Sequence, residues 1–250
     1  MNMLLNTLLK PPKLKNIKRA ICVQPHPDDN EIGMGGVIAK LVNEGCEVHY
    51  ITVTDGSLGL LDGSMTHEEL TKIRKKECEE SGRLLGVTNF HYLNYKDGTL
   101  SDIYKIAGDI GEIIRTVKPE FVFCPDPWLT YEAHQDHIVT GKAVAQSFIS
   151  TWLYEYPLGT KTKSHKVKGI GFYYTSKPNT IVDITGTIDI KIKAISKHKS
   201  QFDKKTLLLF SVYFKQKAKE DAANEKFKLG CGLKILGQNH MHCFPNAEEV

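Results

Sequence analysis

The sequence has no paired-cysteine pattern. Its six cysteines include no CxxC pair and follow no regular spacing, and several fall within short apolar runs typical of strands. A disulfide framework is therefore not expected, and the residues indicate reduced, mostly buried thiols in a cytoplasmic protein. Four metal-capable residues near the C-terminus, Cys231, His240, His242 and Cys243, match no zinc-finger spacing, so we interpret them as structural.

Long hydrophobic runs are also missing. No segment approaches the roughly 20 apolar residues that cross a bilayer. The first residues, MNMLLNTLLKPPK, are apolar over a short stretch, with no basic region before it and no small-residue cleavage site. We therefore expect neither a membrane span nor a signal peptide.

A dense block of basic residues is absent as well. Lysine and arginine exceed aspartate and glutamate by 33 to 29, and the lysines are scattered over residues 10–18, 161–168 and 191–205 without interleaved aromatic residues. This pattern argues against a nucleic-acid interface. The chain also has no repeat and no linker rich in proline, glycine or serine, so we expect one domain over residues 1–250, with residues 1–16 as a loose arm.

What the sequence does contain is an alternation of strand and helix patterns. Short β-branched and aromatic runs alternate with segments whose apolar residues recur every three or four positions. We expect strands at 19–24, 46–53, 89–93 and 120–124, and helices at 33–45, 66–86 and 102–117. The less regular second half adds a helix at 137–150, strands at 169–175 and 180–184, and a helix at 187–200. Four strand–helix units in series predict an α/β fold whose parallel sheet is covered on both faces.

Polar residues crowd the segments that follow the first four strands. His26, Asp28, Asp29 and Glu31 follow the first, TDGSLG the second, NYKDG the third and PDPWLTYEAHQDH the fourth. In an open parallel sheet, the ligand crevice lies beyond the carboxyl ends of the strands. These side chains are therefore expected to converge at one edge of the sheet.

Two of these segments carry residues of metal-ligand type. His26-x-x-Asp29 and His134-x-x-His137 could each be a hydrogen-bonded pair. Together, two imidazoles and a carboxylate with an open fourth position form the ligand set of a catalytic zinc site. The adjacent Asp28 and Asp29 would also repel each other unless a cation or protons compensate them. One could bind the metal while the other takes a proton from water, so metal-assisted hydrolysis is the expected reaction class.

The motifs HPDDNEIGMGG and HQDH, with TDGSLG, IRKKECEESGRLLGV, YKDGTL, VDIT and KHKSQ, resemble the LmbE/PIG-L family of zinc-dependent N-deacetylases. They occur in order over residues 21–201. The resemblance implies a Rossmann-like three-layer α/β sandwich with a mostly parallel sheet, in agreement with the element pattern. It also implies hydrolysis of an N-acyl group, usually acetyl on an N-acetylglucosamine-type substrate, at a single Zn²⁺, although Fe²⁺ or Co²⁺ could occupy the same ligands.

Matching the family motifs residue by residue implies the reacting groups. The zinc ligands are His26, Asp29 and His137, and Asp28 is the general base that deprotonates the attacking water. His134 is the second catalytic group, because its imidazolium could stabilise the tetrahedral oxyanion and share proton delivery to the leaving amine with Asp28.

Three further residues are matched to supporting roles. Asp136 is similar to the family residue that orients and charges the neighbouring imidazole. Arg74 and Asp97 lie where the family has sugar-contacting residues, which makes them substrate-binding candidates. Trp128 and Tyr131 precede His134 in the same segment, and they could stack on a sugar face or pack within their loop.

The chain departs from the family pattern at two places. Gln135 stands where many relatives have proline, at a side chain with no assigned role. The segment 229–250 differs from the YAEAF-like segment that closes over the substrate in relatives, so the family's lid does not identify the substrate here.

Other functions have weaker support in the residues. Gly33, Gly35 and Gly36 form GxGG and not the dinucleotide fingerprint GxGxxG, so we attribute them to close packing of the helix on the sheet. Ser57 lacks the glycine pattern of a nucleophile elbow and indicates a turn. The alternatives are a hydrolase of a non-sugar N-acyl amide and a metal- or carbohydrate-binding protein without turnover. The segment EIGMGG is also similar to the family branch that deacetylates a glucosaminyl-malate compound, and a homo-oligomer stays open.

Overall fold

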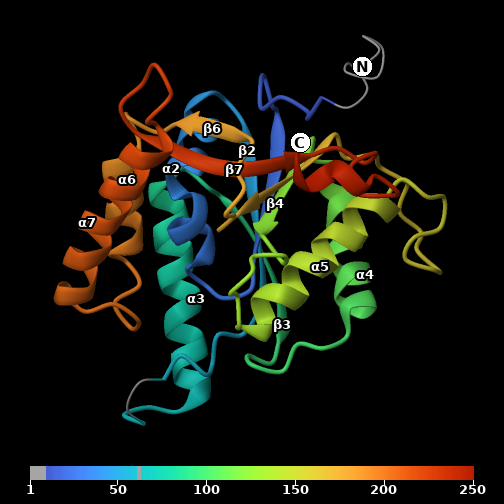
Figure 1. The fold of residues 1–250 in the computed structure, drawn as a ribbon. Coiled ribbons are helices and arrows are strands. Elements are labelled where there is room, and N and C mark those ends of the chain that lie inside the picture. The colour runs from blue at the N-terminus through green and yellow to red at the C-terminus, as the bar shows by residue number, and fades with distance from the viewer. Residues whose placement is uncertain (1–9, 61–62) are drawn as a thin grey trace.

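The strands of the computed structural model, which describes residues 10–60 and 63–250, form a seven-stranded sheet in the order β3-β2-β1-β4-β5-β7-β6 (Figure 1). Every strand except β7 runs in the same direction, and β7 is antiparallel to both of its neighbours. The strands are β1 (Arg19–Gln24), β2 (Glu47–Thr54), β3 (Asn89–Tyr95), β4 (Phe121–Pro125), β5 (Gly169–Tyr173), β6 (Thr180–Asp183) and β7 (Gly230–Leu236). The strand order reverses between β1 and β4, which is where an open α/β sheet forms its ligand crevice.

Helices cover both faces of the sheet (Figure 1). One layer holds α2 (Asp29–Asn43), α3 (His67–Leu84), α6 (Ile188–Ile195) and α7 (Lys204–Asp221). The other holds α4 (Ile103–Val117) and α5 (Gln135–Ser150), and a short 3-10 turn, η1 (Pro245–Glu248), lies near the C-terminus. Each layer has its own buried apolar cluster, so the expected three-layer α/β sandwich with a mostly parallel sheet is confirmed.

Local sequence explains where several helices begin and how closely they pack. Thr66 and Glu69 form both hydrogen bonds of a capping box at the start of α3. Lys118 ends α4 in the left-handed conformation, directly before Pro119. On α2, a Cβ at Gly33 would lie 2.3 Å from the ring of Tyr173, so the glycine is needed for the close packing that the sequence indicated.

The structure corrects the expected elements in several places. The helix expected at 33–45 begins at Asp29, which places the acidic residues in its first turn. The helix expected at 187–200 ends at Ile195, and a turn carries the chain through His198 to Gln201. Helix α7 and strand β7 were not expected. Of the expected arm, residues 1–9 lie outside the described residues, and residues 10–16 form no regular element, although Leu14 packs against the core.

The described part of the chain contains no helix that is long and apolar enough to cross a membrane. All six cysteines are free, and five of them are buried.

Arg115 anchors the loop that follows α5. Its side chain is buried on α4 and donates hydrogen bonds to the carbonyl oxygens of Thr151, Leu153, Tyr154, Tyr156 and Thr162. Its Nε also donates to the Thr162 hydroxyl at 2.9 Å. One guanidinium thus satisfies carbonyl groups that the irregular backbone of this loop leaves without helix or sheet partners.

We expect Arg115→Met to destabilise the protein by about 3 kcal/mol, because five buried or partly buried carbonyl groups would lose the same donor. Urea unfolding of wild type and variant measures the difference. Arg83→Met is the matched control, since Arg83 is exposed and pairs with Glu79 on the surface of α3, and it is expected to cost less than about 1 kcal/mol. Equal losses for the two variants would contradict the anchoring role.

Candidate active site

The acidic segment after β1 is held by its own turn and by the start of α2. The backbone N–H of His26 donates to Asp29 Oδ2 at 3.0 Å, which folds the carboxylate back over the end of the strand. Asp28 is the N-cap residue of α2, and Asp29 is the first residue of the helix. Carboxylates are stabilised at this end of a helix, where backbone N–H groups carry partial positive charge.

Three of the predicted residues converge as a group of ligand type. His26 Nδ1 lies 3.2 Å from Asp29 Oδ2, and His137 Nε2 lies 3.4 Å from Asp29 Oδ1. One donor atom from each residue lies within 4.8 Å of the other two. His137 reaches the group from the first turn of α5, across the switch point between β1 and β4. Two imidazoles and one carboxylate at these separations fit a single divalent cation of the zinc type.

The ring nitrogens of His26 and His137 that face away from this group lie close to other carboxylates. His26 Nε2 lies 3.2 Å from Asp97 Oδ1 and 3.4 Å from Asp136 Oδ2, and His137 Nδ1 lies 3.4 Å from Glu132 Oε2. Carboxylates in these positions orient metal-binding imidazoles and increase their basicity.

The ligand group and the carboxylates around it carry more negative charge than the nearby imidazoles can balance. Burial alone would lower the pKa of His26, but the carboxylates of Asp136, Asp29 and Asp97 reverse this effect and raise it to about 12. Burial would raise the pKa of Asp29, and the facing His137 and His26 hold it below its ordinary value. A bound cation would balance this excess of carboxylates, so the donor set and the surrounding charge both fit a metal ion.

Asp28 points away from its neighbour Asp29, as the sequence led us to expect. Its Oδ2 accepts a hydrogen bond from Arg74 Nη2 at 3.2 Å, and Arg74 Nη1 donates to the Gly56 carbonyl at 2.8 Å. The two adjacent carboxylates therefore have separate partners. Asp28 faces a pocket of about 280 Å³, whose lining residues are His26, Asp28, Leu58, Gly59, Arg74, Asp97, Gly98, His134 and Gln201.

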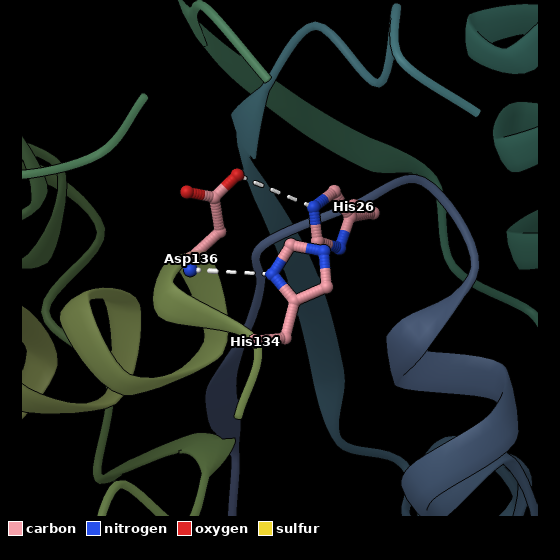
Figure 2. Close-up of side chains that lie close together, drawn as sticks. All are labelled: His26, His134 and Asp136. Carbon is pink, nitrogen blue, oxygen red and sulfur yellow. Dashed lines mark hydrogen bonds and ion pairs between the residues drawn. The ribbon is translucent and has the colours of Figure 1, made fainter. Parts of the chain in front are cut away.

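His134 enters this pocket from the N-cap position of α5. Its Nδ1 accepts the backbone N–H of Asp136 at 3.3 Å, and its ring lies edge-on to His26 with centroids 4.6 Å apart (Figure 2). A neutral ring that accepts this bond carries its proton on Nε2. Burial, together with the nearby His26 and His137, lowers the pKa of His134. The arrangement thus favours a neutral imidazole with an Nε2–H donor, where the sequence analysis expected an imidazolium.

The imidazole that Asp136 contacts belongs to His26, which lies beyond the end of β1 and not beside Asp136 in the sequence. Its carboxylate faces His26 Nε2 and not the His134 ring, as Figure 2 shows. The backbone N–H groups of Gly98 and Leu100 donate to it at 2.7 and 3.2 Å. The reason is tertiary: the first turn of α5 packs against the segment after β3, which directs this side chain across the sheet edge.

The two substrate candidates both line the pocket, and each also has an internal partner. Arg74 is buried and paired with Asp28. Asp97 faces His26 with one oxygen and accepts the Leu58 backbone N–H with the other at 2.9 Å. Their expected contact with a sugar stays a prediction, and the structure adds a positioning role for both.

Three residues at the site received no role in the sequence analysis. Tyr174 donates its hydroxyl to Asp29 Oδ1 at 3.4 Å, and Glu132 lies against His137. Gln201 lines the pocket from the turn after α6. Gln201 belongs to the KHKSQ motif, which could have indicated it, whereas Tyr174 looked like an ordinary strand residue. Glu31, by contrast, does not join the ligand group, because its buried carboxylate lies 3.7 Å from Nε2 of His198, in the turn after α6.

Other residues singled out in the sequence take ordinary positions. Trp128 packs edge-on against Phe172, with ring centroids 5.5 Å apart, and Tyr131 is 95% exposed. The Ser57 hydroxyl accepts a hydrogen bond from Lys96 within its turn. Among the described residues, the C-terminal cysteines and histidines form no group that could hold a metal ion.

Comparison with known proteins places this geometry in a family. The family model PIG-L, described as GlcNAc-PI de-N-acetylase, matches residues 21–148. The diacetylchitobiose deacetylase of Thermococcus kodakarensis is 33% identical over 94% of this chain and 89% of its own length. The crystal structure of the N,N'-diacetylchitobiose deacetylase from Pyrococcus horikoshii, in complex with its inhibitor MPG, superposes with a TM-score of 0.88 and 38% identity, and the match covers 94% of this chain and 90% of that one. A probable N-acetyl-alpha-D-glucosaminyl L-malate deacetylase 2 of Bacillus anthracis is 26% identical over 80% of this chain and 88% of its own length.

Proposed function

Because the chain belongs to the PIG-L family of de-N-acetylases, we propose that it is a zinc-dependent enzyme that hydrolyses the acetamido group of an N-acetylglucosamine-type sugar. The observation that carries the proposal is the three-residue ligand group next to a pocket that is lined by a second carboxylate, Asp28, and a further imidazole, His134. This combination supplies the parts that metal-assisted amide hydrolysis needs.

His26, Asp29 and His137 would hold the metal ion. When bound there, a divalent ion supplies Lewis acidity, which polarises an acetyl carbonyl and acidifies water. Zinc suits two imidazoles and a carboxylate with an open position, while Fe²⁺ and Co²⁺ accept the same ligands. Asp97, Asp136 and Glu132 would keep the two imidazoles oriented toward the ion.

Asp28 would take the proton from the attacking water. Its hydrogen bond from Arg74 holds the carboxylate at the wall of the pocket. His134 would donate its Nε2–H to the oxygen of the tetrahedral intermediate, and protonated Asp28 would return its proton to the leaving amine. Each of these groups lines the same pocket, so one bound acetamido group could contact them together.

The pocket favours a sugar that is linked to a neutral group over the glucosaminyl-malate of the Bacillus relatives. Among the described residues that line it, Arg74 is the one permanent cation, and its guanidinium already serves Asp28 and the Gly56 carbonyl. A malate group carries two carboxylates that would need cations of their own. We therefore propose an N-acetylglucosamine oligosaccharide such as diacetylchitobiose as the substrate. The six free cysteines support a cytoplasmic location, where thiols stay reduced.

Release of primary amine from a small panel tests this proposal. The zinc-loaded protein is incubated with diacetylchitobiose, N-acetylglucosamine, N-acetylglucosaminyl malate and a non-sugar acetamide. We expect the highest kcat/KM for diacetylchitobiose. A preference for the malate would refute the proposed substrate but keep the reaction, and turnover of the non-sugar amide alone would refute the sugar class. No amine from any compound, in protein shown to hold one zinc per chain, would indicate a binding protein without turnover.

A further inference from the structure

A second and larger pocket lies behind the metal-ligand group. Its volume is about 480 Å³, against about 280 Å³ for the pocket that Asp28 faces. It is enclosed by α2, α6, α7 and β7, and much of its wall is aromatic or aliphatic, including Ile188, Phe210, Tyr213 and Phe214. Pockets of this size and character bind small organic molecules.

The pocket contains a buried cation that lacks an anion. The side chain of Lys191 is 95% buried, since the residue is 5% exposed, and its Nζ lies 4.3 Å from the centroid of the Phe214 ring. Within residues 10–60 and 63–250, no carboxylate lies within ion-pair distance of this ammonium group. Burial lowers the pKa of Lys191, as is usual for an ammonium group that has lost its water.

The nearest candidate for a counter-ion is already engaged. Asp221 also lines the pocket, but its Oδ1 pairs with Lys217 and its Oδ2 accepts the Gly232 backbone N–H at 3.0 Å. Lys217 is thus neutralised, whereas Lys191 is not. A buried ammonium group is costly without a partner, so an anion entering this pocket would be bound with little competition.

We propose that this pocket binds a small carboxylate with an aromatic or aliphatic body. The carboxylate would pair with Lys191, and the apolar body would pack against Phe210, Tyr213 and Phe214. One unpaired cation in a mostly apolar wall favours a single negative charge over a phosphate group, which carries more charge and needs more donors.

The pocket shares a wall with the ligand group. Tyr174 lines the pocket, its hydroxyl donates to the backbone oxygen of Asp29 at 3.3 Å, and its ring stacks on His137 with centroids 6.0 Å apart. An occupant would therefore contact a residue that touches two of the residues proposed to hold the metal. This link to catalysis rests on the proposed function, whereas binding of a carboxylate at Lys191 does not.

Calorimetric titration of the zinc-loaded protein with 2-naphthoate and its neutral analogue 2-naphthylmethanol tests the proposal. We expect wild type to bind both, and Lys191→Met to lose about tenfold or more in affinity for the carboxylate relative to the alcohol. The matched control is Lys215→Met, which changes an α7 lysine that pairs with Asp189 and does not line the pocket, and which should leave that ratio unchanged.

Two results would overturn the proposal. The first is that naphthoate does not bind wild type, and the second is that Lys191→Met still binds naphthoate more tightly than the alcohol, by the same ratio as wild type. The second result would indicate that the carboxylate binds the zinc ion instead. If Lys191→Met does not fold, crystals of wild type grown with naphthoate decide the question. A carboxylate within about 4 Å of Lys191 Nζ supports the site, and a carboxylate elsewhere refutes it. None of these readouts depends on deacetylase activity, so the carboxylate site and the proposed function are tested independently of each other.

Discussion

Asp28→Asn is expected to lower kcat by about 10²- to 10⁴-fold, the usual contribution of a general base, while the protein keeps its metal. An asparagine preserves the size of the side chain and can still accept the hydrogen bond from Arg74, but its amide cannot take a proton from water. The proposed ligand atoms belong to His26, Asp29 and His137, so metal content should not change. Steady-state amine release and metal analysis of the same preparation measure both quantities.

Asp126→Asn is the matched control for this variant. Asp126 follows β4 near the same edge of the sheet, where its Oδ1 accepts the Trp128 backbone N–H, and it makes no hydrogen bond or ion pair with His26, Asp29 or His137. We expect its kcat to stay within about twofold of wild type, as for a carboxylate outside the reacting groups. Full activity in Asp28→Asn would show that another group accepts the proton.

His137→Ala is expected to abolish turnover by a different route, because it removes one of the three proposed metal ligands. We expect metal affinity to fall by more than about 100-fold, since even the loss of an outer partner of a ligand commonly costs 10- to 100-fold. The remaining His26 and Asp29 would leave an incomplete set for a tetrahedral ion. Zinc retained after dialysis against a competing chelator, measured per chain, reports the loss.

The exposed His242 provides the control for the histidine change. His242→Ala removes an imidazole from the C-terminal segment, where its partner is Cys243, and should leave zinc content at one per chain. Stoichiometric zinc in His137→Ala after chelation would contradict the proposed ligand set. Zinc content also distinguishes the two active-site variants, because Asp28→Asn should keep zinc but lose turnover, whereas His137→Ala should lose both.

Residues that carry strong local patterns were predictable from the sequence. The capping box of Thr66 and Glu69 starts α3 where expected, and the apolar spacing of 102–117 forms α4. Helix α7 was not predictable in this way. Its apolar residues Leu207 to Phe210 are consecutive rather than spaced by three or four, and none of these four is buried. Strand β7 contains two glycines and is stabilised by its neighbours β5 and β6 rather than by β propensity.

By itself, the sequence determined the α/β class, the alternation of strands and helices, and which residues could bind a metal, because these depend on local periodicity and on side-chain chemistry. Only the tertiary structure decided which of those residues meet. It directs Asp136 to His26, pairs Asp28 with Arg74, and buries Glu31 beside His198 rather than in the ligand group. It also places Lys191 in an apolar pocket where no carboxylate of residues 10–60 and 63–250 pairs with it. The physical reason is that such pairings join residues far apart in the chain, and their geometry depends on how helices pack on the sheet, which no short stretch of sequence encodes.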